Sequence, residues 1–315
     1  MWSWSRFLEG EPAAGVEPRL EPGGAARKLR IATRRLVDAA LSGGFKSAFR
    51  GSGLEFREVR AYAPGDDVRR IDWNVTARTS TPHVKTYAEE RELEVRLVLD
   101  ASRGMAFGTR ACTKAEVAAR AAALLAFAAA RNQDKVGLTV AALDARRRTP
   151  CKKGLRQASQ VARGATEARG DGASALVEAL EAEERLLRRR SVVFVLSDFR
   201  CVHAEAPRVE RLLQRLNRRH DVVAVRIADP LELALPAAGP LVIDDLEGGG
   251  RHEVDGRSSA AREAWNAAAR RRRSAEDAVF AKARVDVVDL STEGDVELPF
   301  VALFKRRVAG KGGRA

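Results

Sequence analysis

The chain has 315 residues, 45% of them hydrophobic and 31% charged, and 56 Lys and Arg against 43 Asp and Glu give a formal net charge of +13. This hydrophobic content is sufficient for a packed core, and the length fits one elaborated α/β domain or two domains. Widely separated cysteines argue against a zinc site or a disulfide framework, and the absence of a signal peptide or a membrane-length apolar run predicts a cytoplasmic protein.

The amino-terminal part is expected to contain an arm followed by a small β-containing module over 28–92. Residues 1–27 mix Gly, Pro and Glu without periodicity, which predicts a mobile arm. Apolar residues at helical spacing predict an amphipathic helix over 30–41. An alternation of apolar and charged residues predicts a half-exposed strand over 54–62, and a second strand is expected over 83–88.

A turn and a helix are expected between these two strands. Pro64-Gly65 predicts the turn, and Asp66 is expected to cap a helix over 68–78 by accepting a backbone hydrogen bond. The inner face of this helix is expected to include Ile71, Trp73 or Asn74, and Val75. Mixed-sign charges are dense here: Arg60, Asp66, Asp67, Arg69, Arg70, Asp72 and Arg78. Such clusters more often pair internally than bind a ligand, so we expect an ion-paired lattice that fixes the module against the following domain.

From residue 93 onward, apolar runs alternate with helical patterns. Residues 93–99 are mostly β-branched or aliphatic, which is typical of a strand buried on both faces, so Asp100 lies at its carboxyl end. Further strands are predicted over 135–143, 146–152 (a charged edge strand), 191–196, 222–227 and 285–290. Helices are predicted over 114–131, 157–169, 205–219 and 298–307. One further helix is predicted to begin at Ser174, and another, rich in arginine, to end at about residue 283. A hairpin insertion with its turn at 248–250 is expected near 231–256, and a basic tail over 308–315.

This alternation predicts an α/β domain over 93–307, with a mainly parallel sheet and helices on both faces. Ligands of such sheets bind where the strands end. The oxygen-bearing side chains expected to meet there are Asp100, Ser102, Ser174 and Asp198. Carboxylate and hydroxyl oxygens suit a hard cation such as Mg²⁺, so the sequence predicts a metal site, with helix capping by the same acids as the alternative.

This arrangement resembles the metal-ion-dependent adhesion site of von Willebrand factor A domains, whose pattern is DxSxS, a Thr and an Asp on three loops. Asp100 and Ser102 in DASRG match the first loop, but Gly104 replaces the second serine. Ser174 stands where the pattern has Thr, and Asp198 in LSDF matches the third loop. The resemblance implies a von Willebrand factor A-like (Rossmann-like) fold and a bound Mg²⁺ that accepts an acidic group of a partner protein. A water would replace the hydroxyl missing at Gly104.

Residues 51–90 resemble the signature of a bacterial family called domain of unknown function, number fifty-eight. The string RxYxPGDDxRxIDW is long and specific, and consists of Arg60, Tyr62, Pro64, Gly65, Asp66, Asp67, Arg69, Ile71, Asp72 and Trp73. The resemblance extends over about 27–307. Members carry a von Willebrand factor A-like domain and are typically encoded beside MoxR-type AAA+ ATPases. It therefore implies an adaptor for such an ATPase and a client protein, in chaperone-like assembly or maturation, with no established enzymatic activity.

Two other functions compete with this interpretation. The arginine runs at 188–190, 218–219 and 270–273 suggest a surface for nucleic acid or anionic membrane, whose binding would fall steeply with salt. Aromatic residues are only 5% of the chain and no recognition motif accompanies these runs, so docking on an acidic ATPase ring is the preferred role.

A serine hydrolase is the second alternative, because DASRG differs at one position from the GxSxG nucleophile elbow. Ser102 would be the nucleophile, with Asp198 and either His220 or His252 completing a triad. The elbow requires a small residue where this chain has Asp100. We therefore expect no enzymatic activity.

Overall fold

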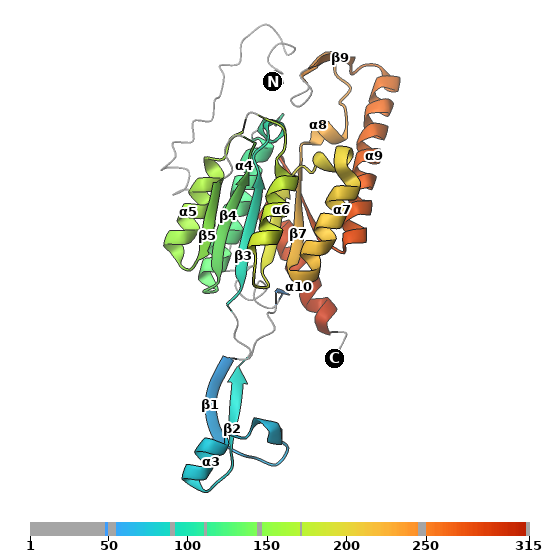
Figure 1. The fold of residues 1–315 in the computed structure, drawn as a ribbon. Coiled ribbons are helices and arrows are strands. Elements are labelled where there is room, and N and C mark those ends of the chain that lie inside the picture. Colours follow the sequence, from blue (N-terminus) through green and yellow to red (C-terminus); the bar gives the residue numbers. More distant parts are fainter. Residues whose placement is uncertain are drawn as a thin grey trace. The chain divides into compact units, whose positions relative to one another are not determined.

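The computed structural model describes residues 48–49, 55–88, 92–109, 112–143, 147–170, 172–244 and 250–312. The chain divides into a smaller unit, Arg50–Leu93, and a larger unit that combines Met1–Phe49 with Glu94–Ala315. The predicted arm over 1–27 and the predicted helix over 30–41 lie outside the described residues. Figure 1 shows the helices and strands of both units.

The smaller unit is built on one antiparallel strand pair. Strands β1 (Glu55–Ala61) and β2 (His83–Ala88) confirm the two predicted strands. Between them lie the 3-10 helix η3 (Val68–Arg70) and the helix α3 (Trp73–Thr79). The signature string therefore runs from the end of β1 through a turn and into both short helices.

The prediction of one continuous helix over 68–78 is wrong. Ile71 forms a backbone bridge to Val84 of β2, and this bridge separates the two short helices. Each helix has its own cap: the side chain of Asp67 accepts a hydrogen bond at the start of η3, and that of Asp72 at the start of α3. A strand-like residue in the middle of the segment thus overrides its helical periodicity.

Asp66, which was expected to cap the helix, stabilises the turn instead. Its two carboxylate oxygens accept hydrogen bonds from the Arg60 guanidinium at 2.8 and 2.6 Å, and one of them also accepts from the Ala63 N–H at 2.9 Å. Trp73 does not belong to an inner face of this unit, because 69% of it is exposed; Val68 is 60% exposed. Both side chains are available at the surface of the smaller unit.

The larger unit contains a six-stranded sheet with the order β10-β7-β6-β3-β4-β5. Its strands are β3 (Glu94–Asp100), β4 (Lys135–Ala141), β5 (Arg147–Lys152), β6 (Val192–Ser197), β7 (Asp221–Ala228) and β10 (Asp286–Ser291). All neighbouring strands are parallel except β4 and β5, which confirms the predicted α/β sheet and its charged edge strand. Counted along the chain this is the doubly wound order, whose switch point lies between β3 and β6.

The helices follow the predicted pattern closely. They are η4 (Arg103–Ala106), α4 (Lys114–Arg131), α5 (Leu155–Thr166), α6 (Leu176–Leu186), α7 (Cys201–Arg219), α8 (Pro230–Leu233), α9 (Ser259–Ala283) and α10 (Glu297–Gly312). The predicted hairpin insertion is present as β8 (Pro240–Asp244) and β9 (Arg251–Asp255). In the part of the chain that the structure describes, no helix is both long and apolar enough to cross a membrane.

Helices cover both faces of the sheet, as predicted. On one face α6, α7 and α9 enclose a core that includes Val98, Val195, Leu213 and Phe280. Figure 1 shows α6 and α7 in front of the sheet and α4 behind it. On the α4 and α10 side, four aromatic rings pack edge to face or tilted: Phe49, Phe194, Phe300 and Phe304. Phe49 thereby anchors the end of the amino-terminal segment to the sheet.

One buried ion-pair cluster ties the sheet to α6. Arg96 of β3 is 1% exposed and lies 3.4 Å from the carboxylate of Glu183, which is itself fully buried. Glu183 also accepts hydrogen bonds from Thr139 of β4 at 2.7 Å and from Arg148 of β5 at 2.9 Å. A single carboxylate therefore fixes one helix against three adjacent strands.

Candidate functional site

The predicted site residues of the first two loops meet at the carboxyl end of β3. Asp100 is 2% exposed and accepts hydrogen bonds from the Ser102 N–H at 2.9 Å, the Ser174 hydroxyl at 2.9 Å and the Ser197 hydroxyl at 2.7 Å. The buried strand ends here because the chain turns into η4 directly after Ala101. Ser174 also accepts the N–H of Leu176, the first residue of α6.

Asp198, the predicted third-loop ligand, directly follows β6 and is bound to a lysine. The Lys114 ammonium lies 2.6 Å from its Oδ2 and 2.8 Å from Oε1 of Glu232. Arg200 completes the cluster, since its guanidinium lies 2.7 Å from the same Glu232 oxygen. Lys114 is 1% exposed and lies in the first turn of α4, where the helix dipole disfavours a cation. Its position therefore depends on the two carboxylates.

Burial and neighbouring charges shift the pKa values of the two aspartates in opposite directions. Burial and the nearby charge of Asp198 raise the pKa of Asp100, although the hydroxyl and amide donors favour its ionised form. Burial also opposes the ionisation of Asp198, but the charges of Lys114 and Arg200 outweigh it and the pKa is lowered. The pKa of Lys114 is raised, because Asp198 and Glu232 outweigh the effect of burial. Asp198 is thus compensated by Lys114 and Arg200, whereas Asp100 forms no ion pair with a residue that the structure describes.

The donors around Asp100 fit a hard cation. The Ser102 hydroxyl oxygen is buried and has no hydrogen-bond partner among the described residues, a condition that native proteins resolve with a water or an ion. Together with Asp100 and Ser174 it offers the carboxylate and hydroxyl oxygens that Mg²⁺ accepts. Asp198 differs, because its nearest cation is the Lys114 ammonium. The described residues contain no cluster of three or more His, Cys, Asp or Glu of the kind that holds a metal.

The backbone is strained next to Asp198. Phe199 has a φ of 55°, a left-handed conformation that a bulky residue rarely adopts. Two contacts hold it there: its N–H donates to the Ser197 hydroxyl at 2.9 Å, and its ring packs against Phe280 with centroids 4.9 Å apart. Ser197 thereby links this strained turn to Asp100, to which its hydroxyl donates.

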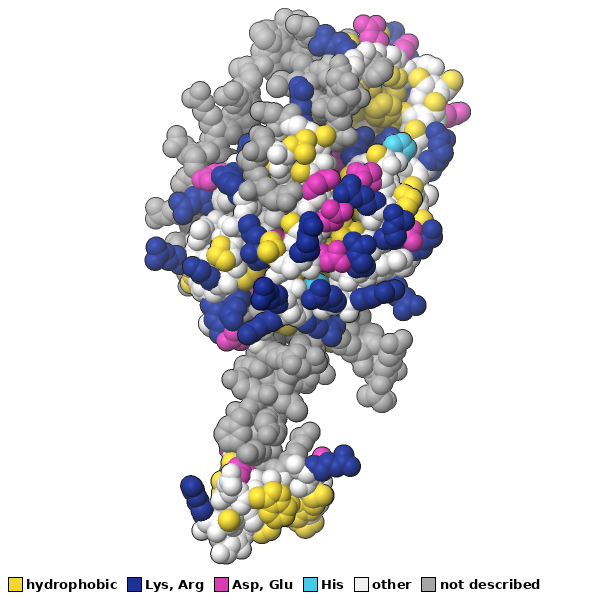
Figure 2. Space-filling view, in the orientation of Figure 1, with side chains coloured by type: hydrophobic (Ala, Val, Ile, Leu, Met, Phe, Trp, Pro, Cys, Tyr) yellow, Lys and Arg dark blue, Asp and Glu magenta, His cyan; other side chains and the backbone are white. Residues whose placement is uncertain are grey.

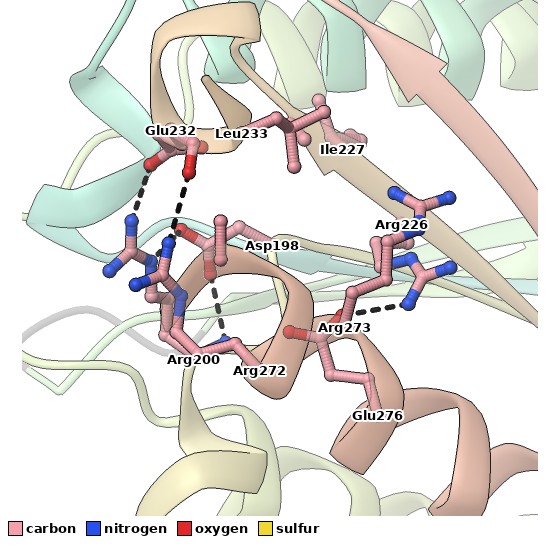
Figure 3. Close-up of a pocket in the computed structure, with 11 residues that line it drawn as sticks. Asp198, Arg200, Arg226, Ile227, Glu232, Leu233, Arg272, Arg273 and Glu276 are labelled. Carbon is pink, nitrogen blue, oxygen red and sulfur yellow. Dashed lines mark hydrogen bonds and ion pairs between the residues drawn. The ribbon is translucent and has the colours of Figure 1, made fainter. Parts of the chain in front are cut away.

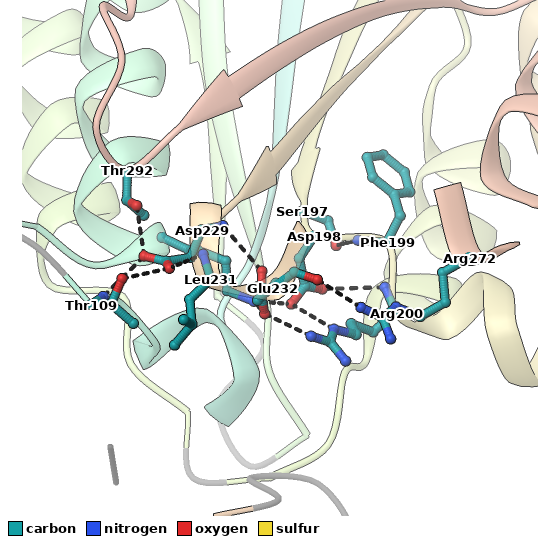
Figure 4. A network of polar contacts seen from close by, with 11 residues as sticks. Thr109, Ser197, Asp198, Phe199, Arg200, Asp229, Leu231, Glu232, Arg272 and Thr292 are labelled. Atoms are coloured by element: carbon teal, nitrogen blue, oxygen red, sulfur yellow. Dashed lines mark hydrogen bonds and ion pairs between the residues drawn. The ribbon is translucent and has the colours of Figure 1, made fainter. Parts of the chain in front are cut away.

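A third aspartate, Asp229, lies at the same edge of the sheet, directly after β7. It is fully buried and accepts hydrogen bonds from the N–H and the hydroxyl of Thr109 at 2.9 and 2.7 Å and from the Thr292 hydroxyl at 2.7 Å (Figure 4). These donors lower its pKa although burial opposes its ionisation. Asp229 therefore joins the loops that follow β3, β7 and β10.

Sequence reasoning missed the polar partners of the site: Lys114, Ser197, Arg200 and Glu232. Ser197 was detectable, because it precedes Asp198 in the same strand-end string. Lys114 and Glu232 lay in segments predicted only as a helix and an insertion, where periodicity gives no information on long-range pairing. His220, one candidate for a hydrolase triad, accepts the Ser191 N–H at the amino ends of the strands, away from Ser102.

Comparisons with known proteins agree with the resemblance of the signature. Residues 58–275 match the family described as "Protein of unknown function DUF58". The chain is 35% identical over 240 residues to "Uncharacterized protein Rv1480" of Mycobacterium tuberculosis, which covers 74% of this chain and 73% of that protein. Similar solved structures include the hypothetical protein BatB from Bacteroides thetaiotaomicron, with a TM-score of 0.43 and 14% identity over 69% of this chain and 99% of that one. The SpRpn10 VWA domain has a TM-score of 0.38 and 11% identity over 69% of this chain and 95% of that one.

Proposed function

Because the chain belongs to the family of proteins of unknown function DUF58, we propose that it is a protein-binding adaptor for a MoxR-type AAA+ ATPase and a client protein. The ATPase partner is taken from the resemblance of the signature string. The proposal places the adaptor in the cytoplasm, where a reducing environment suits the free thiols of Cys112, Cys151 and Cys201.

The observation that best supports an adhesive rather than a catalytic role is the set of contacts around Asp100. Its carboxylate gathers Ser102, Ser174 and Ser197 at the switch point of the sheet, where ligands of doubly wound folds bind. The Ser102 hydroxyl has no hydrogen-bond partner among the described residues, so none of them is placed to activate it as a nucleophile. The same edge therefore suits binding of a partner group.

A divalent cation is part of this proposal. Asp100, Ser102 and Ser174 are the residues that would hold it, with waters in the remaining positions. A bound cation would supply positive charge to Asp100 and a Lewis-acidic position for a carboxylate of the partner. Lys114 keeps Asp198 paired, so this aspartate would act by its charge and not as a ligand.

The experiment is a pull-down of the purified MoxR-type ATPase by the intact chain, in Mg²⁺ or in a chelator, with D100N and the exposed control D255N. We expect capture by the wild type and D255N in Mg²⁺, and a loss of at least about tenfold in D100N or in chelator, because one charged ligand is removed. Asn keeps the shape of Asp100, and its amide nitrogen can donate to the Ser174 and Ser197 hydroxyls, which can act as acceptors, so folding is retained. Absence of capture under all conditions would contradict the adaptor role.

Thermal unfolding tests the cation independently of any partner. A ligand that binds only the folded state raises the melting temperature, so Mg²⁺ is expected to stabilise the wild type and to leave D100N unchanged. An identical response of the two proteins to Mg²⁺ would exclude the cation from the site and leave the adaptor role to the pull-down.

A further inference from the structure

A small pocket of about 40 Å³ lies beside Asp198, at the carboxyl ends of β6 and β7, and is lined by four arginines. Figure 3 shows Arg200 and Arg272 on one side of it, near Glu232, and Arg226 and Arg273 on the other. Arg200 follows β6, Arg226 belongs to β7, and the other two come from α9. Segments that are distant in the sequence therefore direct guanidinium groups toward one place.

Three of these arginines are already paired with carboxylates. Arg226 lies 2.8 Å from both Glu276 and Asp289, and Arg273 lies 2.6 Å from Asp289. Arg200 is paired with Glu232 on the other side of the pocket. Their charges are compensated within the fold, so none of the three requires a ligand by itself, although Arg200 lies beside Arg272 in the pocket wall and can add a second contact.

Arg272 is different. Its hydrogen bond within the described part of the chain goes to the main-chain carbonyl of Glu232 at 3.0 Å, and it forms no ion pair there. The side chain is half-buried in the pocket wall. Burial and the charge of Arg200 lower the pKa of Arg272, against the opposing effect of the Glu232 and Glu276 carboxylates. An anion bound in the pocket would compensate the positive charge of Arg272.

We propose that Arg272 and Arg200 bind a single carboxylate of a partner protein, an Asp or Glu side chain or a chain terminus. A guanidinium matches a carboxylate through two parallel hydrogen bonds. The walls also carry the carboxylates of Asp198, Glu232 and Glu276, which would repel a doubly charged phosphate more strongly than a monoanion, and Arg272 is the lining arginine without an ion pair to a described residue. The small volume likewise suits one carboxylate.

This inference rests on the proposed adaptor function, which supplies the partner carboxylate. The group that binds this carboxylate is, however, a guanidinium and not a cation at Asp100. A partner acid would be bound by guanidinium groups on the β7 side of Asp198 and would need no metal. Asp198 and Glu232 connect the two places, since Glu232 contacts Lys114 and Arg200 and presents its carbonyl to Arg272.

The test is a titration of the intact chain with the peptide acetyl-Gly-Glu-Gly-amide, monitored by NMR of the arginine Nε–Hε groups. The signal of Arg272, identified by its loss in R272Q, is expected to shift saturably. The peptide acetyl-Gly-Gln-Gly-amide should leave it unchanged. In R272Q the peptide should bind at least about tenfold more weakly, since a charge-assisted pair is lost. The exposed neighbour variant R271Q should bind like the wild type.

Three outcomes would overturn the inference: equal shifts with the Gln peptide, unchanged binding by R272Q, or tighter binding of inorganic phosphate than of the Glu peptide. R272K serves as a second variant, because it keeps the charge and loses the bidentate geometry, and it should bind with intermediate affinity. The titration contains no ATPase. If the Arg272 signal does not shift but the ATPase pull-down succeeds, only the pocket proposal is refuted. If the Arg272 signal shifts but the ATPase is not captured, only the adaptor proposal is refuted.

Discussion

At the scale of single residues, Lys114 is the side chain on which the candidate site depends most. Its ammonium is buried between Asp198 and Glu232, and the energy of such a pair lies mainly in the cost of leaving one partner alone. Methionine at this position would fill the same space without the charge. Lys114 thus stands in this chain as a permanent cation beside a site that otherwise suits a metal.

We therefore expect K114M to lower the free energy of unfolding by about 3–5 kcal/mol, because the buried carboxylate of Asp198 loses the ammonium that lies 2.6 Å from it, while Glu232 keeps Arg200. Urea denaturation at neutral pH measures this loss. The control is K282M, which breaks an exposed pair with Glu210 and should change stability little. Equal effects of the two substitutions would show that burial of Lys114 has no energetic consequence.

Asp100 gives a second prediction at this scale, through pH. Its pKa is raised in the folded protein, so its ionised form costs stability at neutral pH. The cost is relieved as the pH falls through the raised pKa toward the unfolded value of about 4. In metal-free buffer D100N should accordingly be more stable than the wild type at neutral pH, and the difference should shrink as the pH approaches about 4. Urea titrations at several pH values test this, and a constant difference would contradict it.

At the scale of elements, the position of α6 is fixed by the buried carboxylate of Glu183. It contacts residues of β3, β4 and β5, and its loss would leave Arg96 unpaired in the core. The adjacent residue Glu184 makes an exposed ion pair with Arg215 of α7. The two neighbours therefore provide a matched comparison of a buried and an exposed carboxylate.

We expect E183A to reduce the free energy of unfolding by about 3–5 kcal/mol, whereas E184A should have a much smaller effect. Urea denaturation of both variants measures the difference. Since the Ser174 hydroxyl accepts the N–H of Leu176, the first residue of α6, E183A should also weaken any binding of Mg²⁺ at Asp100, while E184A should preserve it. A similar loss of stability in both variants would contradict the role assigned to Glu183.

At the scale of the whole molecule, the net charge of +13 does not by itself indicate a nucleic-acid surface. Figure 2 shows Lys and Arg side chains spread over the visible face of the larger unit with Asp and Glu among them. Many arginines are paired internally, including Arg208 with Glu205, Arg215 with Glu184 and Arg307 with Asp221. Paired cations release few counterions from a nucleic acid.

Gel mobility shifts of duplex DNA and of single-stranded RNA are therefore expected only at low salt and should vanish at about 150 mM salt. A retained shift at physiological salt would favour the nucleic-acid function over the adaptor. The control is a variant in which the three exposed arginines of 188–190 are replaced by glutamine. These arginines lie on the segment that precedes β6, away from the Asp100 site.

The sequence by itself determined the order and type of the elements. Strands buried on both faces are apolar along their whole length and helices repeat every 3.6 residues, so these signals survive without knowledge of the fold. The meeting of Asp100 with Ser174 was also predictable, since parallel strands share one carboxyl edge. The exception was residues 68–78, where a bridge from Ile71 to another strand outweighed the local pattern.

Only the tertiary structure decided what compensates each charge at that edge. Lys114, Arg200, Glu232 and Arg272 reach the site from four separate segments, and each residue alone resembles any charged residue of an exposed helix or loop. Burial then determines the chemistry, because the energy of a charge depends on its surroundings and not on its neighbours in sequence. The pairing of Asp198, the metal-fitting oxygens at Asp100 and the position of Arg272, which forms no ion pair with a described residue, are all consequences of packing.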